Sequence, residues 1–99
     1  MQMLSLWRGP ITPPPKSMAA IAAEIAQAHG LTLAQLCASD RRARIVHPRQ
    51  AAMAAMREVR WSDGRRRYSF PQIARFFGLK DHTTVVYGVK AAALRRAAP

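Results

Sequence analysis

The residues best suited to recognise another molecule lie together between positions 81 and 84. A carboxylate, an imidazole and two hydroxyls occupy four consecutive positions, Asp81, His82, Thr83 and Thr84. Such groups form hydrogen bonds with base edges and with phosphates. An acid–base pair for catalysis is not expected here, because neighbouring residues of a helix do not face each other. We therefore expect this segment to bind a ligand rather than to catalyse a reaction.

A helix that begins at Asp81 would turn these groups outward. At 100° per residue, Thr83, Tyr87 and Lys90 fall on one side of that helix, with Thr84 beside them. The opposite side is apolar and is expected to face the core; it comprises Val85, Val86, Val89, Ala92 and Ala93. Asp81 is expected to cap the helix, since its carboxylate can accept a hydrogen bond from the N–H of Thr83 or Thr84.

A shorter helix is expected just before this one. Ser69 is a candidate N-cap, and Pro71 falls in the first turn, where the missing N–H of proline is tolerated. Gly78 can adopt the left-handed conformation that ends a helix. Two helices joined by a short turn that contains glycine are the outline of a helix-turn-helix, whose second helix contacts bases in the major groove. In that second helix Gly88 is unfavourable by about 1 kcal/mol relative to alanine, which predicts a close approach to another helix or to DNA.

At these residues the chain resembles a known family. Residues 73–78, followed by the sequence DHTTV at 81–85, resemble the signature of the C-terminal DNA-binding domain of the bacterial replication initiator DnaA. The pair Arg41-Arg42 followed by Pro48-Arg49-Gln50 resembles the basic loop and the next helix of that domain. The resemblance covers residues 17–96, and it implies an all-α fold that binds double-stranded DNA.

The resemblance also implies roles for residues before the helix-turn-helix. In the family an arginine of the basic loop enters the minor groove, where A·T-rich stretches concentrate negative potential. Arg41 or Arg42 is expected to take that role, and both stay candidates because the spacing departs from the family by one residue. Arg49 and Gln50 match the phosphate-contacting pair of the family.

Further contacts with phosphate are expected around the two helices. Phe70 and Pro71 occupy positions that approach phosphate in the family, and Lys80 and Lys90 flank the second helix. Arg57 lies on a polar side of the preceding helix and extends the basic surface. The expected DNA-binding residues are Arg41, Arg42, Arg49, Gln50, Arg57, Phe70, Pro71, Lys80, Asp81, His82, Thr83, Thr84, Tyr87 and Lys90.

The charge of the chain supports a polyanionic partner. Sixteen Lys and Arg residues against five Asp and Glu give a formal charge of +11, and thirteen of these cations are arginine. Nucleic acid is the first expectation and an anionic membrane surface the second. No apolar run reaches the length that spans a bilayer. The single cysteine, Cys37, excludes an internal disulfide and is expected to be buried, which fits a cytoplasmic protein. The resemblance implies that this protein is bacterial and nucleoid-associated.

No cofactor, metal ion or enzymatic activity is expected. The 99 residues contain no Gly-x-x-x-x-Gly-Lys-Ser/Thr loop to hold a nucleotide phosphate, so ATPase activity is not expected. The histidines at 29, 47 and 82 and Cys37 do not show the spacing of metal ligands.

The rest of the chain is expected to be scaffold. Residues 1–16 form a proline-rich tail, and residues 17–99 form one helix-turn-helix domain of five or six helices. Besides the two helices above, three are expected, at 17–29, at 33–38 after the cap Thr32, and from Pro48 as first residue to 61. Their buried residues are expected to be Met18, Ile21, Ile25, Ala28, Leu33, Leu36, Ala52, Met53, Met56 and Val59.

Two loops carry six of the thirteen arginines. Residues 40–47 are expected to form the arginine loop, and Asp63-Gly64 predicts a turn within residues 61–69. That second loop is longer than in the family. Its run Arg65–Arg67 is either a phosphate-binding element or a flexible, solvated insertion.

These features predict sequence-specific binding of double-stranded DNA at sites like the short A·T-rich DnaA boxes. Binding would regulate replication initiation or transcription by occupancy. Two alternatives remain: a transcriptional repressor with a diverged operator, and an interaction protein that docks on replication factors through its apolar N-terminal segment. A replication-initiation protein is thus a second candidate partner, whereas no membrane or small-molecule substrate is expected.

Overall fold

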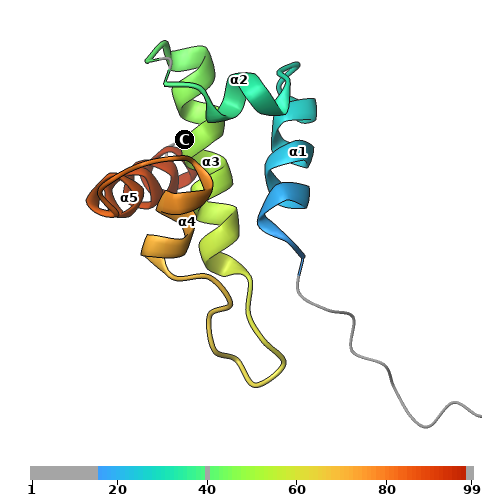
Figure 1. Cartoon of the computed structure of the whole chain (residues 1–99), viewed down its shortest axis with the longest axis vertical. Coiled ribbons are helices and arrows are strands. Elements are labelled where there is room, and N and C mark those ends of the chain that lie inside the picture. The colour runs from blue at the N-terminus through green and yellow to red at the C-terminus, as the bar shows by residue number, and fades with distance from the viewer. Residues whose placement is uncertain (1–15, 40, 98–99) are drawn as a thin grey trace, which may run out of the picture.

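The structure is a computed structural model that describes residues 16–39 and 41–97. The predicted proline-rich tail, apart from Lys16, and residue 40 of the predicted arginine loop lie outside the described residues. The described chain is all-α, as expected, and α3 lies between α1 and the α4–α5 pair (Figure 1). Its five helices are α1 (Met18–Ala28), α2 (Leu33–Cys37), α3 (Ala43–Glu58), α4 (Phe70–Phe76) and α5 (Thr83–Ala97).

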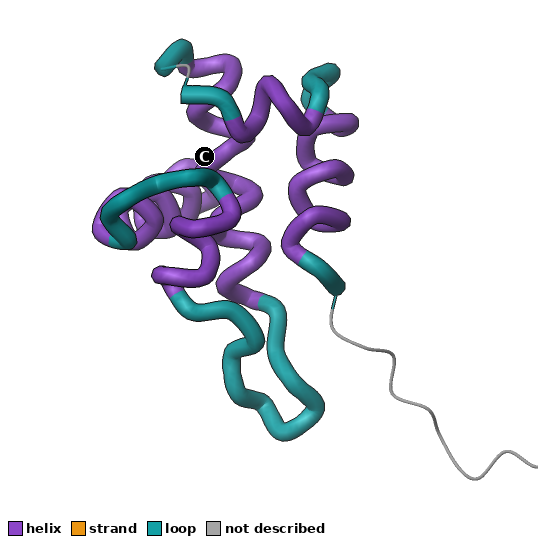
Figure 2. Tube along the Cα trace, in the orientation of Figure 1, coloured by secondary structure: helices purple, strands orange, loops and turns teal. Residues whose placement is uncertain are grey.

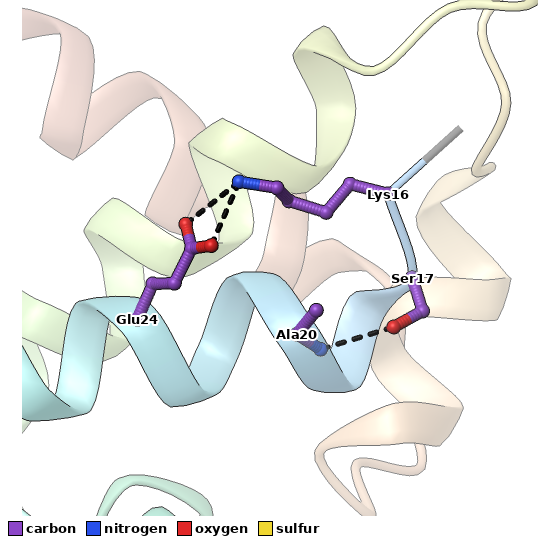
Figure 3. Close-up of polar contacts among 4 residues, drawn as sticks. All are labelled: Lys16, Ser17, Ala20 and Glu24. Carbon is purple, nitrogen blue, oxygen red and sulfur yellow. Dashed lines mark hydrogen bonds and ion pairs between the residues drawn. The ribbon is translucent and has the colours of Figure 1, made fainter. Parts of the chain in front are cut away.

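The first helix begins and ends where the sequence predicts. The hydroxyl of Ser17 accepts a hydrogen bond from the N–H of Ala20 at 3.1 Å, which satisfies one of the free donors of the first turn. Lys16 reaches along the helix, and its ammonium donates to both carboxylate oxygens of Glu24 at 2.8 Å (Figure 3). Gly30 ends the helix with φ of +69°.

Two more helices begin at predicted caps. Each cap residue accepts from a backbone N–H three positions later, and the glutamine there bonds back to the N–H of the cap. The pairs that form these capping boxes are Thr32 with Gln35 before α2, and Ser69 with Gln72 before α4.

Two residues predicted to be buried are exposed, and a residue between the helices is buried instead. The N–H of Leu31 donates to the carbonyl of Ala26 at 2.8 Å, and this turn buries the Leu31 side chain against the core. Ala28 and Leu33 are exposed, contrary to expectation, while Leu36 is fully buried as predicted.

Helix α3 begins at Ala43, five residues before the expected first residue, Pro48. The carbonyl of Arg42 accepts from the N–H groups of Ile45 (2.9 Å) and Val46 (2.8 Å), so a complete turn precedes the proline. Ile45 is 1% exposed, and burial of such a side chain stabilises this turn by roughly 2 kcal/mol. The predicted arginine loop is thus helical from Ala43 onward, because a core contact outweighs the local preference of proline.

The far end of α3 also differs from the prediction. The helix ends at Glu58 rather than near Trp61, and Val59, predicted to lie in its buried stripe, is half-buried just beyond the helix. The other predicted core residues of this helix are buried, namely Ala52, Met53 and Met56.

Residues 59–68 form a hairpin that extends beyond α3 and α4 (Figures 1 and 2). We refer to residues 59–68 as the hairpin. The predicted turn is present: Gly64 has φ of +90°, and the carboxylate of Asp63 accepts from the N–H of Arg65 at 3.0 Å. Backbone pairing joins its two arms through Trp61 N–H to Arg65 O at 2.8 Å, Arg67 N–H to Val59 O at 2.8 Å, and a bridge between Arg60 and Arg66.

Helix α5 packs most extensively against α3, through a stripe centred on its glycine. Val85, Gly88 and Ala92 are buried, and a Cβ at Gly88 would lie 2.7 Å from the sulfur of Met53. This is the predicted close approach to another helix. Because the stripe follows positions 85, 88 and 92, Ala93 is exposed rather than buried, while the other predicted residues are half-buried, namely Val86 and Val89.

Candidate nucleic-acid interface

Asp81 caps α5, as the sequence predicts, although the helix begins at Thr83 rather than at Asp81. The carboxylate of Asp81 accepts a hydrogen bond from the N–H of Thr83 at 2.9 Å. Hydrogen bonds from the backbone and the side chain of Thr83 hold the pKa of Asp81 below its usual value. The next carbonyl, of His82, accepts from Val85 at 2.9 Å and from Val86 at 3.1 Å. The residues at the start of this helix therefore have a defined geometry.

One side of α5 is presented outward. Tyr87 is 68% exposed, whereas Val85 on the opposite side is fully buried. His82 is exposed as well, and its Nδ1 lies 4.0 Å from a carboxylate oxygen of Asp81. The remaining members of the outward side are exposed too, namely Thr83, Thr84 and Lys90. The predicted orientation of the helix is confirmed, and contact of these residues with DNA stays a prediction.

The two candidate minor-groove arginines lie directly before α3. Arg41 and Arg42 are both exposed, and Arg42 is the N-cap residue of the helix. Arg44, expected in the same loop, is an exposed residue of the first helical turn. The loop is consequently shorter than predicted, and it presents two adjacent arginines at one end of α3.

Arg49 connects α3 with the end of α2. Its Nε donates to the carbonyl of Leu36 at 2.8 Å, and an Nη donates to the carbonyl of Ala38. These carbonyls lie at the C-terminus of a helix, where a cation is favourable. Sequence reasoning missed this role, since no local pattern relates residues that lie eleven and thirteen positions apart.

Gln50 connects α3 with α5. Its side-chain oxygen accepts a hydrogen bond from Arg95 at 2.6 Å. Arg49 and Gln50 lie in the second turn of α3, not in the first turn as expected, because the helix begins at Ala43. Both side chains are half-buried, so each contributes to the scaffold as well as to the surface.

Arg57 joins the end of α3 to the start of α4. Its guanidinium donates to the carbonyl of Tyr68 at 2.8 Å and lies 4.0 Å from the centre of the Phe70 ring. Phe70 is half-buried under this cation, and Pro71 beside it is exposed, as is Lys80 in the turn before α5. These contacts give Arg57 a positioning role for the first residues of α4.

The remaining sequence predictions concern the cysteine, a metal site and a membrane span. Cys37 is half-buried; burial raises the pKa of its thiol, and nearby Arg49 lowers it by a smaller amount. Within residues 16–39 and 41–97, no three residues among His, Cys, Asp and Glu cluster closely enough to hold a metal ion. In the same part of the chain, each helix is too short or too polar to cross a bilayer.

Comparisons with known proteins identify the family. The model of the bacterial DnaA protein helix-turn-helix matches residues 18–91. The chromosomal replication initiator protein DnaA of Thermus thermophilus is 39% identical over 67 residues, which is 68% of this chain and 14% of that protein. Its counterpart in Latilactobacillus sakei is 42% identical over 71 residues, 72% of this chain and 14% of that protein.

A third relative, from Buchnera aphidicola, is 36% identical over 66 residues, or 67% of this chain. The chain spans about 14% of the length of these relatives. No solved structure matches it. The matched segment includes α1 to α4 and the exposed first turn of α5, and the chain therefore belongs to the family of the DnaA helix-turn-helix, a DNA-binding domain.

Proposed function

We propose that this protein binds double-stranded DNA at sites like DnaA boxes and regulates replication initiation or transcription by occupying them. The observation that carries the proposal is the outward side of α5, where the capped first turn presents an imidazole and two hydroxyls at fixed positions. Helices of this class insert such a turn into the major groove.

The proposed complex has two base-reading elements. His82, Thr83 and Asp81 contact bases in the major groove, with the carboxylate of Asp81 accepting from a cytosine amino group. At the other element, Arg41 or Arg42 enters the adjacent minor groove. The arginine recognises the width and the negative potential of the minor groove, whereas the residues of α5 recognise the hydrogen-bond donors and acceptors of the bases in the major groove.

Phosphate contacts hold the domain in register. Lys80 and Lys90 flank the inserted turn and are exposed. The start of α4, the first helix of the helix-turn-helix, approaches the DNA backbone through Phe70 and Pro71. Arg49 and Gln50 of α3 supply the remaining phosphate contacts, on the side of the arginine loop.

Selection of bound oligonucleotides from a random pool tests this proposal. We expect a consensus similar to a DnaA box, and in competition the box should bind about 10³-fold more tightly than scrambled DNA at 150 to 200 mM salt. A different consensus would instead identify a diverged operator. Recovery of random oligomers alone would overturn the proposal of specific binding.

A further inference from the structure

Contacts between its own side chains and backbone hold the hairpin in one conformation. Arg60 donates to the carbonyl of Gly64 at 2.9 Å, across the turn. The guanidinium of Arg67 lies 4.6 Å from the centre of the Trp61 ring and 4.7 Å from that of Tyr68. Tyr68 is buried, and such stacked cations keep their N–H groups available at the edge of the guanidinium plane. The hairpin thus holds its arginines at defined positions.

Positive charge on the hairpin is not balanced by the protein. Four arginines and one aspartate give residues 59–68 a net charge of +3. The single carboxylate, Asp63, pairs with Arg65 at 2.7 Å, and this pair is exposed and weak. The neighbouring carboxylate of Glu58 pairs instead with Arg96 on α5 at 3.0 Å.

Arg57, at the base of the hairpin, lies close enough to two of these cations to be affected by their charge. Burial lowers the pKa of Arg57, and the nearby positive charges of Arg66 and Arg60 lower it further. Arg66 comes this close because its guanidinium donates to the carbonyl of Arg57 at 2.6 Å. A cluster that repels itself is stabilised by an external polyanion, which the protein alone does not provide.

The hairpin and the arginine loop lie at opposite ends of α3 (Figure 1). A helix of 16 residues is about 24 Å long. The hairpin continues beyond that end, and the arm from Val59 to Asp63 adds roughly 13 Å. The bridged pair Arg60 and Arg66 is therefore roughly 30 Å from Arg42 and the tip roughly 37 Å. One turn of B-DNA, about 34 Å, falls between these two distances. Two successive minor grooves are separated by the same distance.

We propose that the hairpin is a second DNA-binding element that contacts the sugar–phosphate backbone one helical turn from the arginine loop. The proposal rests on the proposed function, because it uses the docking of α5 in the major groove between these two points. Arg60, Arg65 and Arg66 are exposed and supply the contacts. Since these contacts are to phosphate, they add affinity and length to the footprint without adding base specificity.

Hydroxyl-radical footprinting of the unaltered protein on a 40-base-pair duplex with a central site provides the first test. We expect a second protected backbone segment, about 10 base pairs from the segment protected by the arginine loop. A footprint that stops at the major-groove contacts would overturn the proposal.

The second test compares a long with a short duplex. The double variant Arg60→Gln/Arg66→Gln should bind the 40-base-pair duplex roughly tenfold more weakly, with a salt slope smaller by about 1.8, as two lost phosphate contacts require. Its affinity for a short duplex that ends beside the major-groove site should match that of the parent. Arg60→Lys/Arg66→Lys retains the charge and should retain most of the affinity for the long duplex.

The outcomes separate this proposal from the proposed function. Equal weakening on both duplexes would show a general effect of charge, and no weakening on either would show that the hairpin does not contact DNA; both overturn the second element. Because phosphate contacts do not depend on sequence, Arg60→Gln/Arg66→Gln should also weaken binding to a long scrambled duplex. Specific binding fails instead if the parent does not distinguish the box from scrambled DNA. Should the glutamine variant not fold, as judged by circular dichroism, the footprint decides.

Discussion

At the scale of single residues, the candidate interface depends on side chains that fix the backbone beside side chains that face outward. Asp81 holds the N–H of Thr83, while the hydroxyl group of Thr83 lies on the exposed side of α5. Arg49 likewise holds the end of α2 from within α3. Substitutions at these positions should therefore separate loss of recognition from loss of structure.

Thr83→Ala should reduce discrimination between bases. Alanine keeps the backbone N–H that Asp81 caps but loses the hydroxyl that also bonds to Asp81. The helix should therefore persist with a weaker cap, while a contact to a base edge is lost. We expect specific binding to weaken by about 1–3 kcal/mol, with little change for scrambled DNA. Competition binding measures both values. Lys90→Gln is the matched control, because it should weaken both DNAs alike; unchanged discrimination in Thr83→Ala would show that α5 does not read the bases.

Arg49→Ala should reduce the stability of the domain. The variant leaves two carbonyls at the end of α2 without their charged donor, which should lower the free energy of unfolding by roughly 1–3 kcal/mol. Urea denaturation measures this change. If Arg49 also contacts phosphate, the folded variant should bind all sequences more weakly, whereas unchanged affinity of the folded fraction would restrict Arg49 to its structural role.

Acid should weaken the helix cap at Asp81 and the hairpin turn at Asp63. The pKa of each carboxyl is lowered in the folded state by hydrogen bonds, from Thr83 and Arg65 respectively. Each contribution is therefore fully present above the unfolded pKa, about 3.9, and is lost as the pH falls through the lower folded value. Unfolding measured from pH 5 to pH 2.5 should show a smaller pH dependence in Asp81→Asn and in Asp63→Asn than in the parent. An unchanged dependence in either variant would contradict the hydrogen bonds assigned to that carboxylate.

At the scale of elements, the sequence predicts features that depend on near neighbours and misses those that depend on distant contacts. The caps at Ser17, Thr32 and Ser69 involve residues at most three positions apart, so their partners are visible in the sequence. The start of α3 depends instead on burial of Ile45 against distant helices, and the prediction at Pro48 is therefore five residues too late. The pairing of the hairpin arms is likewise not predictable, since only its turn has a sequence signature.

Gly88→Ala should destabilise the packing of α5 on α3. The added methyl group would lie 2.7 Å from the sulfur of Met53, which is 2% exposed and has little room to move. Overpacking of this kind outweighs the gain in helix propensity, so we expect a net loss of about 1 kcal/mol and a lower melting temperature. Ala93→Gly, at an exposed position of the same helix, is the control that changes helix propensity without changing a buried contact. A melting temperature above that of the parent would show that the two helices can separate to admit the methyl group.

At the scale of the whole molecule, composition predicts the kind of partner and the fold determines where the charge lies. The excess of arginine indicates a polyanion, but it does not reveal that Arg49 and Arg57 serve partly as internal connections. Nor does it show that α3 separates two basic ends, the arginine loop and the hairpin. Those facts depend on which helices pack together, and no single stretch of the chain encodes them.

The far end of α5 is joined to α3 by Arg95 with Gln50 and by Arg96 with Glu58. The helix whose first turn is proposed to contact DNA therefore cannot tilt without breaking these contacts and the packing around Gly88. Association should then proceed as the docking of a preorganised body. Calorimetry should give a heat-capacity change set by the apolar area covered, without the excess that accompanies coupled folding.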